Sequence, residues 1–377
     1  MINRQRICDE FSRQASIDSP SYKEGRIAQY LTERLARMGA TVEFDDSAKH
    51  TGSESGNLIA RIPGTKQGPA FMLSGHMDTV TPANNVVPVL NNGVFRSEGD
   101  TVLGADDKAG LTEIIEAVEV LKEQNIPHVP LEIVITVCEE IGLLGAKNLD
   151  VSKIDARWGV ALDTNGVDRA IHRAPAANRM TIQICGQEAH AGVAPETGIS
   201  AIHIAAKAIA RMRLGRIDDE TTANIGVIKG GQASNIIPGQ VTLKGEVRSH
   251  SHKKLRQQTD HILKCLEDEV SRATIEVDGK TIHATLSLDI RDDYPAMTVP
   301  LDAPILALFN DAGRALGRSV TIGMAGGGSD ANVFNEKGIQ TVILGTGMEQ
   351  VHSVKEEVTV DDMVRVSELL VEMIKKA

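Results

Sequence analysis

Apolar residues along this chain alternate between helical spacing and short continuous runs, which is the pattern of an α/β fold. After a turn signal at residues 19–21, apolar positions recur every three or four residues and predict an amphipathic helix that ends at Gly39. Its apolar positions are Ile27, Tyr30, Leu31, Leu35 and Met38. Two β-rich runs follow at 57–62 and 70–75, and we expect them to be neighbouring strands.

Longer apolar runs predict the centre of a sheet. The run LEIVITVC after Pro130 is typical of a central strand buried on both faces, and 158–163 and 340–345 predict further strands. Helices are expected from about Asp106 to Leu121, at 305–316 and at 361–375. We therefore expect a central, mostly parallel sheet flanked by helices.

The pattern changes from about Pro175. Segments with strand and helix character then follow in the order β-α-β-β-α-β, which predicts a small ferredoxin-like α+β layer. We expect residues 176–290 to be inserted into a discontinuous domain of residues 1–175 and 291–377. A length of 377 residues agrees, because it exceeds one ordinary hydrophobic core.

Composition and charge exclude several classes of protein. A net charge of -11 and an aromatic content of 3% do not suit a nucleic-acid binder. No apolar run approaches the ~20 residues of a membrane span, and the N-terminus lacks a signal-peptide core, so we expect a cytoplasmic protein without membrane attachment. The four cysteines are scattered without a CxxC, so any metal would be held by His, Asp and Glu.

Several predicted strands end in a histidine or an acid. His76 and Asp78 close one run, Glu139 and Glu140 close another, and Asp163 closes a third. Ligands of open α/β sheets gather just beyond the carboxyl ends of the strands, so these side chains are candidates for one site. Each has a plainer interpretation, because a His-Asp pair can cap a loop and adjacent acids can be solvated.

A helix start and a late loop add further candidates. Asp106 and Asp107 begin the predicted helix, where carboxylates also serve as caps, and His352 lies in a loop before the last helix. The combined set suits two divalent ions ~3.5 to 4 Å apart that share one carboxylate and hold a bridging water of lowered pKa. Its members are His76, Asp78, Asp106, Glu139, Glu140, Asp163 and His352.

Eight segments, in this order, resemble the M20 family of dinuclear zinc metallopeptidases. They are SGHMDTV, GADDKAG, CEEIGLLGA, ALDTNG, GQEAHAGVAPETG, ASNIIPG, GGGSDANVF and the loop that carries His352. The resemblance spans most of the chain and is closest to the peptidase T-like, tripeptide aminopeptidase-like branch. It implies a zinc-exopeptidase-like catalytic domain with an inserted lid and dimerisation domain.

The resemblance also implies a role for each ligand candidate. One metal ion would be bound by His76 and Asp163, the other by Glu140 and His352, and Asp106 would bridge the two. Zinc is the expected metal, while manganese and cobalt accept the same nitrogen and oxygen ligands.

Two acids beside the ligands are assigned by the same resemblance. Glu139 would be the general base, and Asp78 would fix the orientation of the His76 ring. The peptide bond between Asp106 and Asp107 would be cis.

The inserted domain resembles the lid of the family. His190 would donate to the developing oxyanion, while Asn235 and Arg248 would contact the substrate carboxylate and backbone. Alternatively, His190 closes a turn and Arg248 pairs with Glu246 on the sheet surface. Close backbone approach to a substrate is expected at Gly326, Gly327 and Gly328.

The sequence therefore predicts metal-dependent hydrolysis of amide bonds in short peptides by an aminopeptidase, with a homodimer formed through the inserted domain. An N-acyl amino acid deacylase or carboxypeptidase of the same family is the alternative, and a catalytically silent metal- or peptide-binding protein is a third. Ala325 stands where tripeptidases carry a basic residue, which bears on peptide length. An intact Glu139 argues against a silent binder, since a binder needs no base.

Overall fold

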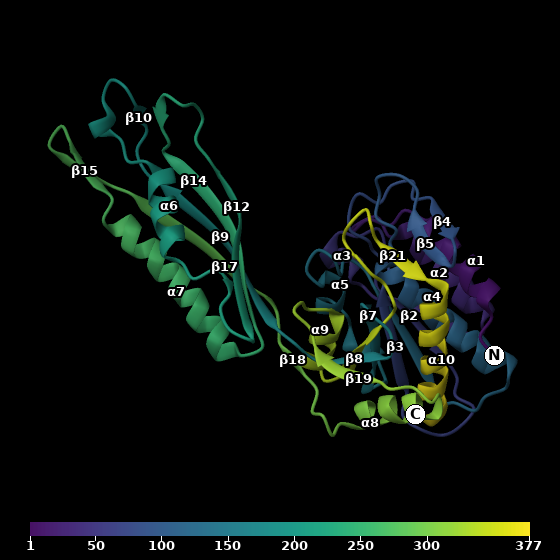
Figure 1. Cartoon of the computed structure of the whole chain (residues 1–377). Helices are drawn as coiled ribbons and strands as arrows, with labels where there is room; N and C mark the ends of the chain where they lie inside the picture. The colour runs from purple at the N-terminus through teal and green to yellow at the C-terminus, as the bar shows by residue number, and fades with distance from the viewer. The chain divides into compact units, whose positions relative to one another are not determined.

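A computed structural model describes residues 1–377, which divide into two compact units (Figure 1). Unit 1 comprises Met1–Ala174, Met297–Ala325 and Ser329–Ala377. Unit 2 comprises Pro175–Ala296 and the short segment Gly326–Gly328. The chain therefore leaves unit 1 twice, for the long segment Pro175–Ala296 and for the three glycines Gly326–Gly328.

A nine-stranded mixed sheet forms the centre of unit 1. Its order is β1 (Thr41–Phe44), β2 (Leu58–Ile62), β6 (Leu131–Thr136), β3 (Phe71–His76), β7 (Trp158–Thr164), β20 (Gln340–Gly345), β8 (Arg169–Ala174) and β18 (Met297–Thr298), with β19 (Thr321–Met324) also on β8. Strands β6, β3, β7 and β20 are parallel, whereas β1, β2 and β18 pair antiparallel. The parallel sheet expected from the sequence is thus the centre of a larger mixed one.

One predicted strand pairing is wrong. Strands β2 and β3, adjacent in sequence, are separated by β6, which pairs antiparallel with β2 and parallel with β3. Every residue of β6 is buried, as is every residue of β3. A strand that is apolar on both faces buries most apolar surface at the centre of a sheet. Its buried backbone N–H and C=O groups then need a neighbouring strand on each side as hydrogen-bond partners.

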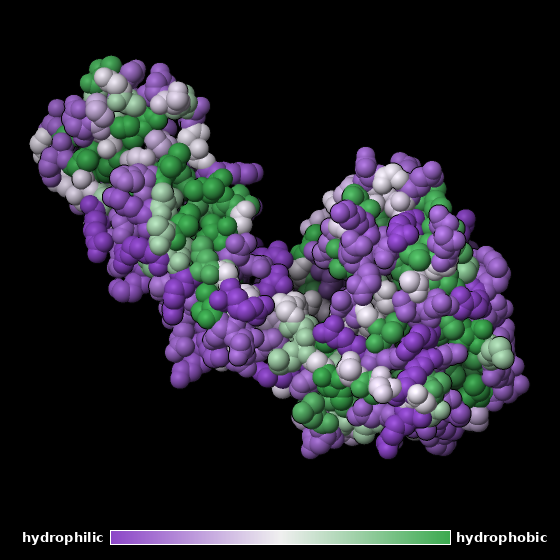
Figure 2. Space-filling view, in the orientation of Figure 1, coloured by the Kyte–Doolittle hydropathy of each residue, from purple (hydrophilic) through white to green (hydrophobic).

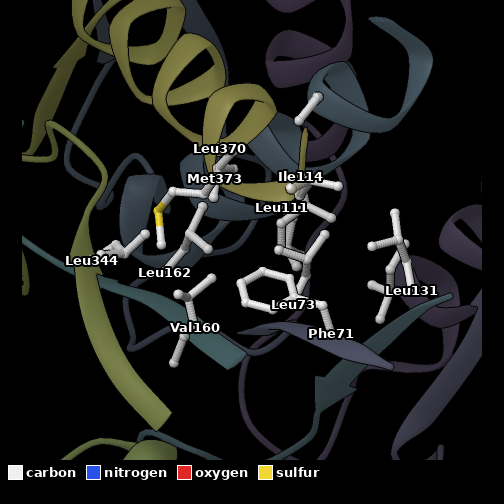
Figure 3. Packing of buried hydrophobic residues seen from close by; sticks show 14 of the residues in the cluster. Phe71, Leu73, Leu111, Ile114, Leu131, Val160, Leu162, Leu344, Leu370 and Met373 are labelled. Carbon is white, nitrogen blue, oxygen red and sulfur yellow. The ribbon is translucent and has the colours of Figure 1, made fainter. Parts of the chain in front are cut away.

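Helices cover the sheet of unit 1. They are α1 (Arg4–Ala15), α2 (Gly25–Arg37), α3 (Ala48–Thr51), α4 (Ala105–Glu123), α5 (Leu144–Lys147), α8 (Pro304–Ala315), α9 (Asp330–Glu336) and α10 (Val360–Lys376), with a 3₁₀ turn at Val151–Lys153. Figure 3 shows Leu111 and Ile114 of α4 and Leu370 of α10 packed over Leu73 and Val160 of the sheet. These helices fix the edge at which β3, β6 and β7 end.

A small three-stranded sheet also belongs to unit 1. It joins β21 (Glu357–Thr359) to β5 (Val94–Ser97) and β4 (Pro88–Asn91), all antiparallel. Strand β21, which follows His352 by five residues, thus pairs with β5, which precedes α4 in the chain.

Unit 2 has the predicted order β-α-β-β-α-β. Its main strands lie in the order β12 (Thr221–Gly230), β14 (Gln240–Ser249), β9 (Ala176–Cys185) and β17 (Thr285–Tyr294), all antiparallel, with β11 (Gly215–Arg216) beside β12. Helices α6 (Ala201–Arg211) and α7 (His252–Ser271) share one apolar core with this sheet. Two short pairs complete it, β10 (Ala189–His190) with β13 (Ile236–Ile237) and β15 (Thr274–Val277) with β16 (Lys280–His283), beside a 3₁₀ turn at Pro195–Thr197.

Hydrophilic residues cover much of the visible face of unit 1, with hydrophobic ones in scattered groups between them (Figure 2). None of the helices is both long and apolar enough to cross a membrane.

We predict that Leu73→Ala lowers the free energy of unfolding of unit 1 by about 2–5 kcal/mol, because Leu73 is fully buried on a central strand. Fluorescence of Trp158 during urea unfolding measures it, since the chain has a single tryptophan, which lies on β7 against Phe71. Leu301→Ala is the control, because Leu301 of the same unit is 65% exposed. Equal losses in the two variants would contradict the assigned core.

Candidate metal centre

The candidate residues of unit 1 meet where the parallel strands end. His76 is the last residue of β3, Asp163 is the next-to-last of β7, and Glu139 follows β6 by three residues. Since β6, β3 and β7 are parallel neighbours, their carboxyl ends lie on one edge of the sheet. The first turn of α4 brings Asp106 to the same edge, and the loop before α10 brings His352.

Asp106 lies between two imidazoles. Its Oδ1 is 3.0 Å from Nε2 of His76, and its Oδ2 is 3.2 Å from Nε2 of His352. The same Nε2 atom of each histidine also lies near a second acid. Oδ1 of Asp163 is 3.9 Å from His76 Nε2, and Oε2 of Glu140 is 3.1 Å from His352 Nε2. The order is therefore acid, histidine, shared acid, histidine, acid.

Burial gives these closely packed acids unusual proton affinities. It raises the pKa of Glu139 and Asp163 well above their ordinary values, and neighbouring carboxylates add to the effect. Hydrogen bonds with Asp106 and then Glu140 raise the pKa of His352 to about 10. Burial also works against the charge of Asp106, but bonds with both histidines lower its pKa. The cluster thus concentrates negative charge away from water.

The donor set fits divalent metal ions. One nitrogen or oxygen atom each from His76, Asp106 and Glu140 lie within 4.8 Å of one another. The second oxygen of Glu140, Oε1, is buried and has no hydrogen-bond partner. A buried carboxylate oxygen without a partner is costly, and a cation satisfies it while balancing the surrounding charge. Imidazole and carboxylate without thiolate suit zinc, manganese or cobalt.

Asp78 connects the two loops that carry these ligands. Its side chain is fully buried, and Oδ1 accepts the N–H of Glu139 at 2.9 Å. Oδ2 accepts the N–H of Glu140 at 3.3 Å and the hydroxyl of Ser21 at 2.7 Å. Nδ1 of His76 faces the backbone oxygen of Asp78 at 3.0 Å, and its Oδ1 at 3.4 Å. Nδ1 therefore carries the ring proton, and Nε2 points to Asp106.

Asp107 does more than cap a helix. The peptide bond before it is cis, as the resemblance implied, and α4 is kinked at Asp106 and Asp107. Oδ2 of Asp107 accepts the N–H of His76 at 3.2 Å, which ties the start of α4 to the end of β3. A Cβ at Gly75 or at Gly110 would come within 2.4 Å of this carboxylate, so both positions need glycine.

Three residues that position the site were missed by the sequence analysis. Ser21 lies in a segment interpreted only as a turn, yet it bonds Asp78. Glu24 is fully buried and accepts the N–H of Cys138 at 3.0 Å, where the chain adopts φ 53° just before Glu139. Glu356 follows His352 by four residues and bonds the chain around Asp106. No spacing reveals these contacts, because each partner is distant in sequence.

Unit 2 holds the remaining candidates in two groups. In the first, the N–H of Ala191 donates to the backbone oxygen of Asn235 at 2.9 Å, and His190 pairs with Ile236 between β10 and β13. Nδ1 of His190 accepts the N–H of Gly192 at 3.2 Å, so a neutral ring carries its proton on Nε2. His190 thus bonds the turn that follows it, and a neutral ring keeps Nε2–H as a donor.

In the second group, Arg248 on β14 donates to both oxygens of Glu246 at 3.0 and 3.1 Å, which is the surface pairing considered as its alternative. A Cβ at Gly327 would lie 3.4 Å from Nη1 of Arg248. The N–H of Gly328 donates to the hydroxyl of Tyr294 at 3.3 Å, and a Cβ there would meet the Tyr294 ring at 2.4 Å. The glycines thus allow this segment of unit 2 to lie close to Arg248 and Tyr294.

The structure does not bring the two groups together. Arg248 pairs with Ala177 near the start of β9, whereas β10 follows the end of β9 at Cys185. Eight residue steps of strand span roughly 26 Å. A tripeptide reaches about 11 Å, so one copy of unit 2 cannot place both groups on one short peptide.

Comparisons with known proteins agree with these observations. A family model described as Peptidase family M20/M25/M40 matches residues 72–376. The uncharacterized protein YqjE of Bacillus subtilis is 41% identical over 378 residues, covering 100% of both chains. The crystal structure of aminopeptidase PepT from Bacillus cereus has a TM-score of 0.89 at 40% identity, and that of a tripeptidase from Staphylococcus aureus has 0.94 at 38%. Each covers 100% of this chain and 99% of the other.

We predict that Asp78→Asn weakens metal binding by roughly 10- to 100-fold. The amide retains the shape of the carboxylate but turns an N–H₂ group toward the donors of Glu139, Glu140 and Ser21. Titration with Zn²⁺ against a chromophoric chelator measures the affinity. Asp45→Asn is a matched control, since Asp45 is a buried acceptor of the N–H groups of Ser47 and Asn57. Unchanged affinity in Asp78→Asn would contradict the connecting role.

Proposed function

Because the chain belongs to peptidase family M20/M25/M40, we propose that it is a metal-dependent aminopeptidase that cleaves short peptides. The observation that carries the proposal is Asp106, whose two oxygens face His76 and His352 with Glu139 alongside. The two similar solved structures named aminopeptidase and tripeptidase support this substrate class.

Two divalent ions, zinc in the first instance, would occupy the centre. His76 and Asp163 would hold one ion, Glu140 and His352 the other, and Asp106 would lie between them, in keeping with the observed order of side chains. When bound, such a pair supplies a water of lowered pKa and an electrophile for the peptide carbonyl.

Glu139 is the proposed general base. It is 8% exposed, its backbone N–H donates to Asp78, and its carboxyl group interacts electrostatically with Asp163 and His76. It would take the proton of the attacking water and give it to the leaving amine. Nε2–H of His190 would donate to the oxyanion, while Asn235, Arg248 and the backbone at Gly327 and Gly328 would hold the substrate.

The proposed assembly is a homodimer formed through unit 2. It is supported by the roughly 26 Å of strand between the His190 and Arg248 groups, since a second copy can supply the group that the first cannot. The cytoplasmic location stays a prediction from the sequence.

We predict that the metal-reconstituted protein cleaves a free-amine tripeptide and loses this activity with a chelator. A dipeptide, an N-acetylated tripeptide and an N-acyl amino acid complete the panel, which also tests peptide length in view of Ala325. Preference for acylated substrates would instead indicate a deacylase or carboxypeptidase. No cleavage of any member by protein with full metal content would indicate a binding protein.

Glu139→Gln should retain the metal and lower kcat by at least 10²-fold, because the base is lost and the ligands stay. Metal content and kcat are measured on the same preparation. Turnover equal to wild type would show that another group is the base.

We predict that His190→Ala and Arg248→Ala are each nearly inactive alone but regain activity when co-expressed. Half of randomly formed dimers are mixed, and one of the two sites in each is intact, so about a quarter of wild-type activity should return. Activity of the co-expressed pair is compared with that of each variant purified alone. No recovery in a verified mixed dimer would contradict a site shared between copies.

A further inference from the structure

We propose that Glu356 is a positioning residue, which fixes Asp106 so that each of its oxygens faces one histidine. This inference rests on the proposed function and concerns the same site. Glu356 is 2% exposed and accepts three backbone N–H groups from a segment some 250 residues earlier. Its Oε2 bonds Leu103 at 2.8 Å and Gly104 at 2.9 Å, and its Oε1 bonds Asp106 at 2.9 Å.

The three contacts join the segment that carries Asp106, the ligand proposed to lie between the ions, to the loop that carries His352. Glu356 is four residues from His352, and its own N–H donates to the backbone oxygen of Ser353 at 3.1 Å, so the loop from 352 to 356 is a compact turn. The opposite loop contains Gly104 at φ 75° and then Asp106. A movement of either loop therefore changes the distance between Asp106 and His352.

The position calls for a carboxylate. Three N–H donors converge on two oxygen atoms, and an ionised carboxylate accepts all of them without presenting a donor of its own. The bond to the N–H of Asp106 itself is the most direct, because it fixes the backbone from which the bridging side chain extends. Glutamine in its place must turn an N–H₂ group toward at least one of the three donors.

A simple structural role is the alternative, in which Glu356 only caps a loop. Loss of the bonds would lower only the stability of the fold if Glu356 has a structural role, and would also weaken metal binding if it positions Asp106. Glu132 provides the comparison, because it is also 2% exposed and accepts the backbone N–H of Ala156 at 2.6 Å and the Nε–H of Arg61 at 3.2 Å. It lies near the amino end of β6, at the opposite end of that strand from the metal centre.

The experiment compares wild type, E356Q and E132Q at full length. Equilibrium dialysis with Zn²⁺ gives metal stoichiometry and affinity, thermal unfolding gives the midpoint, and tripeptide cleavage gives kcat and KM. Both variants should lower the midpoint by similar amounts. E356Q should in addition bind the ion at Glu140 and His352 roughly 10- to 100-fold more weakly, and its kcat should fall with little change in KM. E132Q should bind both ions like wild type.

Metal binding separates the two proposals. E356Q that retains wild-type affinity for both ions would overturn the positioning role, whatever its activity. Equal losses of affinity in E356Q and E132Q would also overturn it, because the effect would then be one of general stability. Wild type that binds two ions but cleaves no peptide would contradict the proposed function and leave the result for Glu356 intact.

Discussion

The site depends on one constraint, which is that several carboxylates must be held close together away from water. Asp106 and Glu139 are buried on one edge of the sheet, Asp163 is partly buried there with 13% of its side chain exposed, and only two histidines lie among them. Without a cation, the cluster is electrostatically unfavourable, as the raised pKa values of Glu139 and Asp163 indicate. Divalent ions remove this cost, so the same feature that strains the folded chain makes it a metal site.

A second set of buried acids holds the segments that carry the candidate ligands in place. Asp78, Glu24 and Glu356 each accept backbone N–H groups from a segment distant in sequence. Asp107 does the same with His76. These bonds hold the loop of Glu139 and Glu140, the start of α4 and the end of β3, each of which carries a candidate ligand. Rigid strands therefore set the edge, and buried carboxylates set the positions of individual side chains along it.

The two units carry different kinds of candidate site residue. Unit 1 supplies every candidate metal ligand, from the ends of β3 and β7, the first turn of α4 and two loops. Unit 2 carries the candidate substrate contacts, but at opposite ends of β9. In the proposed homodimer, one end would come from each copy.

The sequence by itself determined the α/β fold, the β-α-β-β-α-β order of unit 2 and the seven polar residues of the candidate metal centre. Apolar runs ending in His76, Glu139 and Asp163 placed those three on one edge, because strand direction in a parallel sheet brings all carboxyl ends together. Asp106 and His352 joined the set through a predicted helix start and a loop, and the resemblance to the M20 family assigned the roles.

Only the tertiary structure decided that β6 separates β2 from β3 and that Glu24 and Glu356 support the ligand loops. It also decided that His190 and Arg248 lie apart. Periodicity reports whether a residue is buried, but pairing, contacts between distant loops and distances along a sheet arise from packing, which leaves no local pattern in the chain.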